Sequence, residues 1–259
     1  MTSSMTVPKS TAAKAPPTRP RRRFTQRGTR PTVRLADDHP AVVGATPLFP
    51  TRVRSASAAE WILKRGVHSK KLASHFSKGD WLGLPIYSLS LPERSTCPRS
   101  CKVWNDCYGN GMPYAVRFRV DQALYVKLTV ELEALAVIYP KGFAVRLHSL
   151  GDFANPKYVR FWLDAIRAIP KLCVFGFTAW PRASEIGSLI EAESSMWDRF
   201  RIRFSGDNGR RGATVDDPDV WGKIEGGIVC PAQGHRSEIS CGSCGFCVTS
   251  QEPVVFARH

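Results

Sequence analysis

The sequence has no apolar run that could span a membrane. None of its stretches approaches the roughly 18 consecutive apolar residues that a spanning helix needs, and the N-terminus lacks the apolar block of a secretory signal peptide. We therefore expect a soluble, cytoplasmic protein with no membrane partner. The apolar fraction of 43% still matches that of ordinary globular proteins, so the 259 residues are sufficient for a real core.

Acidic residues are also missing from the first 35 positions. This segment holds nine of the 37 basic residues and none of the 22 acidic ones, so most of the net charge of +15 lies there. Because residues 1–50 are also rich in Pro, Ser, Thr and Ala, we expect a disordered basic tail. Such a tail could stay solvated, make weak contacts with nucleic-acid phosphates, or act as a targeting segment.

The remainder of the chain alternates between strand-like and helix-like patterns. The clearest helical period places Leu124, Leu128 and Leu132 on one face. This alternation predicts an α/β fold of about five to six parallel strands, arranged as a partial barrel or as an open doubly wound sheet. The expected strands cover residues 84–91, 143–148, 172–178, 200–204 and 227–229, and the expected helices 57–65, 120–135, 156–169 and 186–190.

Three of the eight cysteines fall in one loop, directly after the first expected strand. Cys97, Cys101 and Cys107 could hold three corners of a four-iron cluster and leave the fourth iron open for an exogenous ligand. A structural metal site normally has four protein ligands, and this loop offers no fourth. The alternative is a zinc site completed by a distant residue such as His148.

A second cysteine group closes the chain. Cys241, Cys244 and Cys247 have the two-residue spacing of ferredoxin-type runs, and Cys230 precedes a proline, as the remote cysteine of such clusters often does. An iron-sulfur cluster is favoured here, with a zinc ribbon as the alternative. In a reducing compartment, metal binding is a better interpretation than disulfides, although eight is an even count. Cys173 lies inside an expected strand and is interpreted as a core residue.

The carboxyl ends of the other expected strands carry polar residues, and in parallel βα folds the functional groups belong at that edge. A carboxylate after a Gly could receive an ammonium group or a ribose hydroxyl, or could cap the next helix. A histidine there could line the site or sit in a polar core, and an aromatic beside the last loop cysteine could pack on a cofactor. The candidate cofactor-binding residues are Tyr108, His148, Ser149, Gly151, Asp152, Thr178, Ser205 and Asp207.

Several motifs in one order resemble the phage gene product 88 domain family, over roughly residues 80 to 250. They are Thr96-Cys97-Pro98 through Cys107-Tyr108, the run from Val145 to Phe153, Phe175 to Thr178, Ser205-Gly206-Asp207, and Ile228 to Gln233 with the terminal cysteines.

That family looks related to radical S-adenosylmethionine enzymes. The resemblance implies a partial βα barrel with a cluster loop after the first strand, and an open iron chelated by the methionyl amine and carboxylate of S-adenosylmethionine. It also implies that Gly151-Asp152 has the role of the amine-binding segment and that the C-terminal group is an auxiliary cluster. One difference is that five residues, instead of the usual two, separate Cys101 from Cys107.

We therefore expect three regions, namely a tail over residues 1–50, a βα domain over 51–226 with the cluster loop, and a cysteine-rich cluster segment over 227–259. The expected function is that of a radical S-adenosylmethionine-like iron-sulfur enzyme with one or two 4Fe-4S clusters, an electron donor as partner, and a substrate that no motif indicates. The alternatives are a zinc-stabilised nucleic-acid-binding protein and a non-catalytic electron-transfer or redox-sensing protein.

Overall fold

The computed structural model describes residues 33–69, 71–216, 228–233 and 238–257. The strands are β1 (Val53–Arg54), β2 (Lys64–Arg65), β3 (Ile86–Ser90), β4 (Arg117–Phe118), β5 (Phe143–Leu150), β6 (Leu172–Thr178), β7 (Phe200–Ser205), β8 (Gly212–Asp216), β9 (Ile228–Val229) and β10 (Val254–Ala257). The α-helices are α1 (Pro40–Val43), α2 (Gln122–Ile138), α3 (Pro156–Ala168), α4 (Glu185–Ala192), α5 (Cys241–Cys244) and α6 (Phe246–Thr249). Short 3-10 turns are η1 (Pro50–Arg52), η2 (Ala56–Ala58), η3 (Gly66–His68), η4 (Tyr108–Gly111), η5 (Glu193–Met196) and η7 (Pro231–Gln233).

Eight of these strands form one sheet in the order β2-β3-β5-β6-β7-β8-β10-β9. All neighbours run parallel except β2, which pairs antiparallel with β3 at one edge. The prediction of an α/β fold with parallel strands is therefore confirmed, and β1 and β4 form a separate two-stranded sheet. No helix within the described ranges is both long and apolar enough to cross a membrane.

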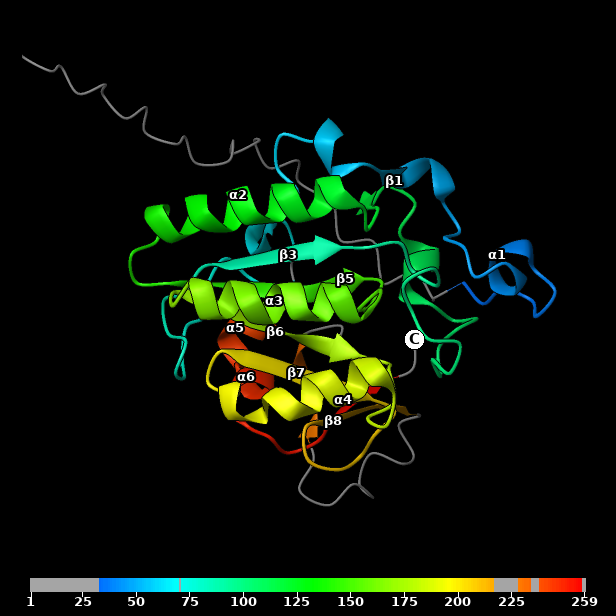
Figure 1. The fold of residues 1–259 in the computed structure, drawn as a ribbon. Helices are drawn as coiled ribbons and strands as arrows, with labels where there is room; N and C mark the ends of the chain where they lie inside the picture. Colours follow the sequence, from blue (N-terminus) through cyan, green and yellow to red (C-terminus); the bar gives the residue numbers. More distant parts are fainter. Residues whose placement is uncertain (1–32, 70, 217–227, 234–237, 258–259) are drawn as a thin grey trace, which may run out of the picture.

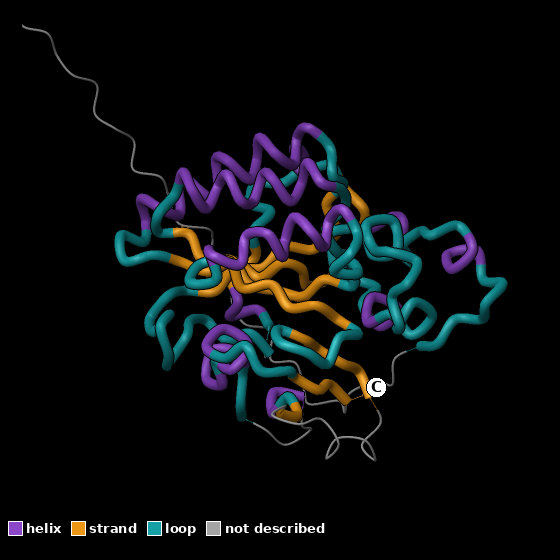
Figure 2. Tube along the Cα trace, turned by 60° about the horizontal axis from the view of Figure 1, so that its bottom comes forward, coloured by secondary structure: helices purple, strands orange, loops and turns teal. Residues whose placement is uncertain are grey.

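The two faces of the sheet are covered differently. Helices α2, α3 and α4 lie on one face, whereas the short helices α5 and α6 lie on the other (Figures 1 and 2). The expected leucine stripe of α2 is buried, and Asp121 caps the helix by accepting a hydrogen bond from the Leu124 N–H. This face holds the main core, and a smaller core on the opposite face contains Phe76, Trp81 and Phe175.

The helix expected over residues 57–65 does not form. The structure has only the turn η2 and then β2 in this region. The backbone N–H groups of Ile62 and Leu63 donate to the two carboxylate oxygens of Glu131 on α2, at 2.7 and 2.9 Å. The prediction was wrong because a buried partner from a distant helix takes the hydrogen bonds that a local helix would need.

Residues 33–50, which we expected to belong to the disordered tail, are ordered and pack against the cysteine loop. The Leu35 N–H donates to the Asn105 carbonyl in the cysteine loop at 3.1 Å, and Arg99 of that loop donates to the carbonyls of Val42 and Val43. The expectation of disorder fails here because Leu35 and Val42 bury apolar surface beside Trp104. The rest of the expected tail, residues 1–32, lies outside the described residues.

Candidate metal centres

The loop of Cys97, Cys101 and Cys107 begins at the carboxyl end of β3, as the sequence predicts. In Figure 1 it continues from the arrowhead of β3 toward the side of the molecule that carries α1. Short turns shape it, because the N–H of Cys97 donates to the Arg94 carbonyl and that of Cys101 to the Pro98 carbonyl, at 3.2 and 3.1 Å. All three cysteines are half-buried.

A buried ion pair between Glu93 and Arg117 lies next to this loop. Arg117 Nε and Nη2 donate to Glu93 Oε2 and Oε1 at 2.8 and 2.9 Å, and neither side chain is more than 1% exposed. Arg117 also donates to the carbonyls of Met112, Ala115 and Gly109. The ion pair is bidentate, and every N–H donor of Arg117 has an acceptor. Such a pair holds the backbone segments around it in one arrangement.

Arg94 lies inside the cysteine loop with one donor unused. Its Nη2 donates to Asn110 Oδ1 at 2.7 Å and its Nε to the Trp104 carbonyl at 3.2 Å. The buried Nη1 has no hydrogen-bond partner among the described residues. Burial raises the pKa values of Cys101 and Cys107, and the positive charge of Arg94 partly opposes this rise, so Arg94 is a cationic neighbour of two of the three thiols.

The three thiols interact with one another but are protonated without a metal. Burial raises the pKa of Cys101 to about 11 and also raises those of Cys97 and Cys107. Hydrogen bonding from the backbone N–H groups of Val103 and Gly109 partly opposes this for Cys101 and Cys107, because it favours the thiolate forms. A metal bound at these cysteines would have to displace their protons, and the same backbone donors would then stabilise the thiolate ligands.

Asp152 is close to this loop, but its carboxylate is already engaged. The N–H groups of Phe153 and Ala179 donate to its two oxygens at 2.7 and 2.6 Å, and Thr178 also hydrogen-bonds to it. Its own N–H donates to Thr96 Oγ1 at 3.0 Å. Burial raises the pKa of Asp152 to about 7. Asp152 and Thr178 thus tie the ends of β5 and β6 to the cysteine loop.

Gly151 has a packing role at the same junction. Its φ is +78°, and an added Cβ would lie 2.7 Å from Thr96 Oγ1 and 2.8 Å from Leu91 Cβ. Only glycine therefore lets the end of β5 approach the start of the cysteine loop so closely. Burial raises the pKa of Cys97, and the charge of the Asp152 carboxylate raises it further.

The other candidate cofactor residues differ in how close they lie to this loop. Tyr108 directly follows Cys107, and the end of β7 approaches the loop, because a Cβ at Gly206 would lie 3.2 Å from Lys102 Cε. His148 faces α3, where its Nε2 lies 3.1 Å from the Tyr158 hydroxyl, and burial lowers its pKa to about 3. Tyr108 is 58% exposed, Ser205 is exposed and Ser149 is half-buried. Asp207 accepts a hydrogen bond from Arg182 Nε at 2.5 Å. It lines a separate polar pocket of about 400 Å³ with Arg182, Glu191, Trp197, Gly209, Arg210, Arg211 and Gln251.

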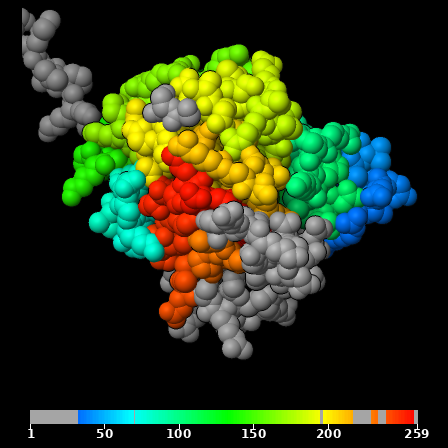
Figure 3. All heavy atoms as spheres, turned by 90° about the horizontal axis from the view of Figure 1, so that it is seen from below, coloured from blue at the N-terminus to red at the C-terminus, as the bar shows by residue number. Residues whose placement is uncertain are grey.

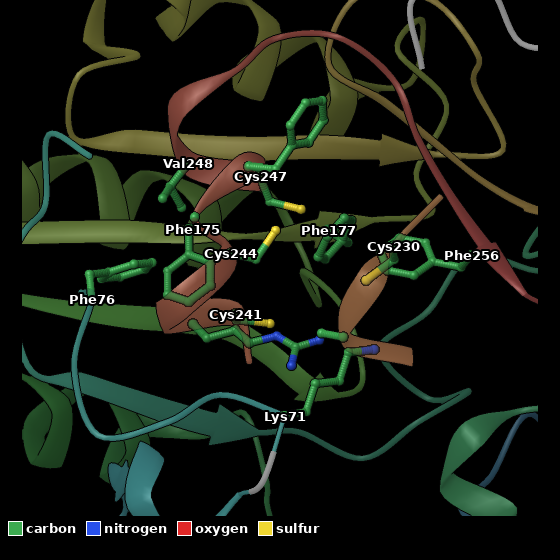
Figure 4. Close-up of a pocket in the computed structure, with 14 residues that line it drawn as sticks. Lys71, Phe76, Phe175, Phe177, Cys230, Cys241, Cys244, Cys247, Val248 and Phe256 are labelled. Carbon is green, nitrogen blue, oxygen red and sulfur yellow. The ribbon is translucent and has the colours of Figure 1, made fainter. Parts of the chain in front are cut away.

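The four C-terminal cysteines line one pocket on the face of the sheet opposite α2. Figure 4 shows their thiols around a common space, which Phe175 and Phe177 of β6 and Phe256 of β10 also line. In the view from below, the C-terminal segment (red) covers this face next to residues near 70 (cyan) (Figure 3). The other walls are mostly apolar, namely Phe76, Phe175, Phe177, Ala232, Gly245, Phe246, Val248 and Phe256.

This pocket is small. Its cavity volume is about 30 Å³, which is room for about two water molecules and too little for an organic cofactor. Four thiols converging there are the donor set of zinc or of an iron-sulfur cluster. Burial raises the pKa of Cys247 to about 12, and the backbone N–H of Ala232 favours the thiolate of Cys230.

Neither cysteine group forms a site for a single metal ion among the described residues. Within the described ranges, no three His, Cys, Asp or Glu side chains form a group that could hold one metal ion. Thiolates bound to one zinc ion at about 2.3 Å lie only about 3.8 Å apart in a tetrahedron. Cys173 belongs to neither group, since it is buried with Phe76 and Trp81 in the smaller core, as expected.

Lys71 and Arg146 are the basic residues of the C-terminal pocket, and sequence reasoning gave Lys71 no role. Arg146 Nε is buried without a hydrogen-bond partner. Burial lowers the pKa of Lys71, as does the charge of Arg146, while Cys241, Cys230 and Cys247 raise it. Only the fold reveals these neighbours, because Lys71 lies in a basic stretch that resembles a solvated connection.

Comparison with known proteins gives one distant similarity. The chain is 29% identical over 133 residues to the Gene 88 protein of Mycobacterium phage L5, a match that covers 46% of this chain and 55% of that protein. It therefore spans little more than half of the relative's length. No protein-family model and no solved structure matches the chain.

Proposed function

We propose that the protein is an iron-sulfur protein with two centres, and that the centre at Cys97, Cys101 and Cys107 binds and reductively cleaves S-adenosylmethionine. The main support for two centres is that seven cysteines form two groups. Beside each group, a buried arginine nitrogen has no hydrogen-bond acceptor among the described residues. A buried donor without a partner costs about 1–3 kcal/mol. Thiolates bound to iron and sulfide would supply the missing negative charge at Arg94 and at Arg146.

The arrangement of the C-terminal thiols is compatible with a multi-atom centre. Cys230, Cys241, Cys244 and Cys247 line one common space, and among the described residues no three His, Cys, Asp or Glu side chains form a group that could hold one ion. When bound with three protein thiolates, a four-iron cluster can supply one electron and an open coordination position for the methionyl amine and carboxylate. Arg94 would offset the charge of that centre, and Asp152, Thr178 and Gly151 would hold the loop that carries it.

The test uses anaerobically reconstituted full-length protein with dithionite and S-adenosylmethionine. We expect a broad absorption near ~400 nm, iron and sulfide in the protein, and formation of 5′-deoxyadenosine and methionine. Cys97→Ser should abolish both products, whereas Cys173→Ser, which removes a thiol outside both groups, should retain them. Iron-loaded protein that forms neither product would contradict the enzymatic proposal, and colourless protein with stoichiometric zinc would contradict both centres.

A further inference from the structure

The C-terminal pocket contains two cations and no carboxylate among its lining residues. Lys71 and Arg146 line it together with the four thiols. Within the described part of the chain, neither side chain donates a hydrogen bond or forms an ion pair. The Lys71 Nζ lies over an aromatic face, at 5.2 Å from the centroid of the Phe256 ring.

Three other buried arginines of the described residues each have at least two hydrogen bonds to acceptors. Arg117 pairs with Glu93, and Arg201 donates to Asp80 at 2.9 Å. Arg203 is fully buried, and its guanidinium donates to the carbonyls of Ser250 and Glu252 at 2.5 and 2.6 Å and to that of Cys247 at 3.3 Å. Arg94 and Arg201 also have one buried nitrogen without a partner, but the guanidinium of each still donates to two acceptors. Among the described residues, no acceptor is found for the side chain of Lys71 or of Arg146.

Two like charges in an apolar pocket repel each other and lose hydration, and both effects oppose folding. Among the described residues that line the pocket, only the four thiols can become negative. Lys71 is also held in place beside them, because its backbone carbonyl accepts the Cys241 N–H at 2.6 Å. The charges of the pocket are thus complementary to a centre that is anionic as a whole.

We infer that Lys71 and Arg146 are the counter-charges of an electron-carrying centre at the four C-terminal thiols, and that they set its reduction potential. This inference rests on the proposed iron-sulfur function. A four-iron core with two positive charges, bound by four thiolates, has a net charge of two minus, and one-electron reduction makes it three minus. The electron comes from a low-potential one-electron donor, here dithionite, and no covalent bond or proton changes place. Nearby cations stabilise the more negative state, so they raise the potential.

The experiment compares midpoint potentials of full-length variants. Lys71→Met removes a cation from the pocket. Lys78→Met is the matched control, because Lys78 lies against Gly245 of the same segment but is exposed to solvent. Each protein is reconstituted anaerobically and titrated with dithionite while the paramagnetic resonance of the reduced centre is recorded. The C-terminal signal is identified as the one that persists in Cys97→Ser.

We expect Lys71→Met to lower the midpoint potential of this signal. At similar distances its shift should be about four-fold larger than that of Lys78→Met, from the ratio of effective dielectric constants of about 80 and about 20. Arg146→Met should also lower the potential, and Lys71→Arg should restore the wild-type value. If Lys71→Met cannot retain the cluster, retention by Lys71→Arg still supports the charge role.

Two outcomes would overturn the inference. One is equal potentials in wild type, Lys71→Met and Lys78→Met, and the other is loss of the cluster in both Lys71→Met and Lys71→Arg, which would show a need for lysine itself and not for its charge. In either case, wild-type protein that holds iron and sulfide and cleaves S-adenosylmethionine leaves the proposed function standing. Wild-type protein without iron would overturn the proposed function itself.

Discussion

At the residue scale, this protein uses buried carboxylates to hold backbone segments together. Glu131 receives the N–H groups of Ile62 and Leu63, and Asp152 those of Phe153 and Ala179. Such a side chain replaces the hydrogen bonds that water would otherwise provide. The cost is that the charged form is desolvated, so each of these groups has a pKa raised to about 7.

This cost makes stability depend on pH through Glu131. Burial raises its pKa from its usual value of 4.5 to about 7, so the folded state holds the proton more tightly than the unfolded state does. This contribution to stability is complete below pH 4.5 and is lost as the pH rises toward 7, by about 3 kcal/mol at about 1.4 kcal/mol per pKa unit.

Glu131→Gln should remove this dependence. We expect the stability of wild type relative to Glu131→Gln to decrease by about 3 kcal/mol between pH 4.5 and 7, measured by urea unfolding at a series of pH values. Because both proteins carry the same other titrating groups, the difference between them isolates this carboxyl. A stability difference that stayed constant over this range would show that Glu131 does not hold a proton in the folded state.

At the scale of elements, the cysteine loop is positioned by the strand ends that it touches. Three features contribute, namely Gly151 after β5, Thr178 at the end of β6, and the ion pair between Glu93 and Arg117 of β4. Glycine is required at position 151 for two reasons, a positive φ and the absence of a Cβ. These two reasons can be separated by comparison with Gly83, whose φ is +82° and whose added Cβ would meet nothing within 4 Å.

Gly151→Ala should therefore cost more than Gly83→Ala. In Gly83→Ala, the positive φ alone should lower the free energy of unfolding by roughly 1 kcal/mol. In Gly151→Ala, the contact of the new Cβ with Thr96 and Leu91 should lower it by about 2 kcal/mol more. Thermal unfolding measures both, and iron content should fall only in Gly151→Ala, because the loop it supports carries the first three thiols. Equal losses of stability in the two variants would show that the close approach is unimportant.

At the scale of the whole molecule, the C-terminal segment is part of the sheet and not an appended unit. Strand β10 pairs with β8 over four residues and β9 joins its other side. Three backbone carbonyls of this segment also accept hydrogen bonds from the buried guanidinium of Arg203. The cysteine-rich region expected over 227–259 thus completes the same fold that carries the first cysteine loop.

Removal of residues 228–259 should prevent stable folding. It would leave the Arg203 charge without three of its acceptors, a loss of about 3–5 kcal/mol for a buried charge, and would uncover Phe175 and Phe177. We expect the shortened chain to aggregate or to lack cooperative unfolding by circular dichroism, whereas the full chain unfolds cooperatively. A monomeric, cooperatively unfolding shortened chain would contradict this.

The sequence by itself determined the local elements and the ligand inventory. Period and length marked α2, α3 and the strands β5 to β7, because each has an apolar face that only one conformation can bury. The cysteines could also be sorted into two groups from the sequence, because Cys97 to Cys107 and Cys241 to Cys247 are each close together in the chain.

Only the tertiary structure decided what lies around those groups. It placed the C-terminal cysteines on the face opposite α2 and brought Lys71 and Arg146 to them from distant segments. It also turned His148 toward Tyr158 and engaged Asp152 with Ala179. Such neighbours depend on how strands stack and which face each side chain meets, and no short stretch of sequence encodes contacts between residues so far apart in the chain.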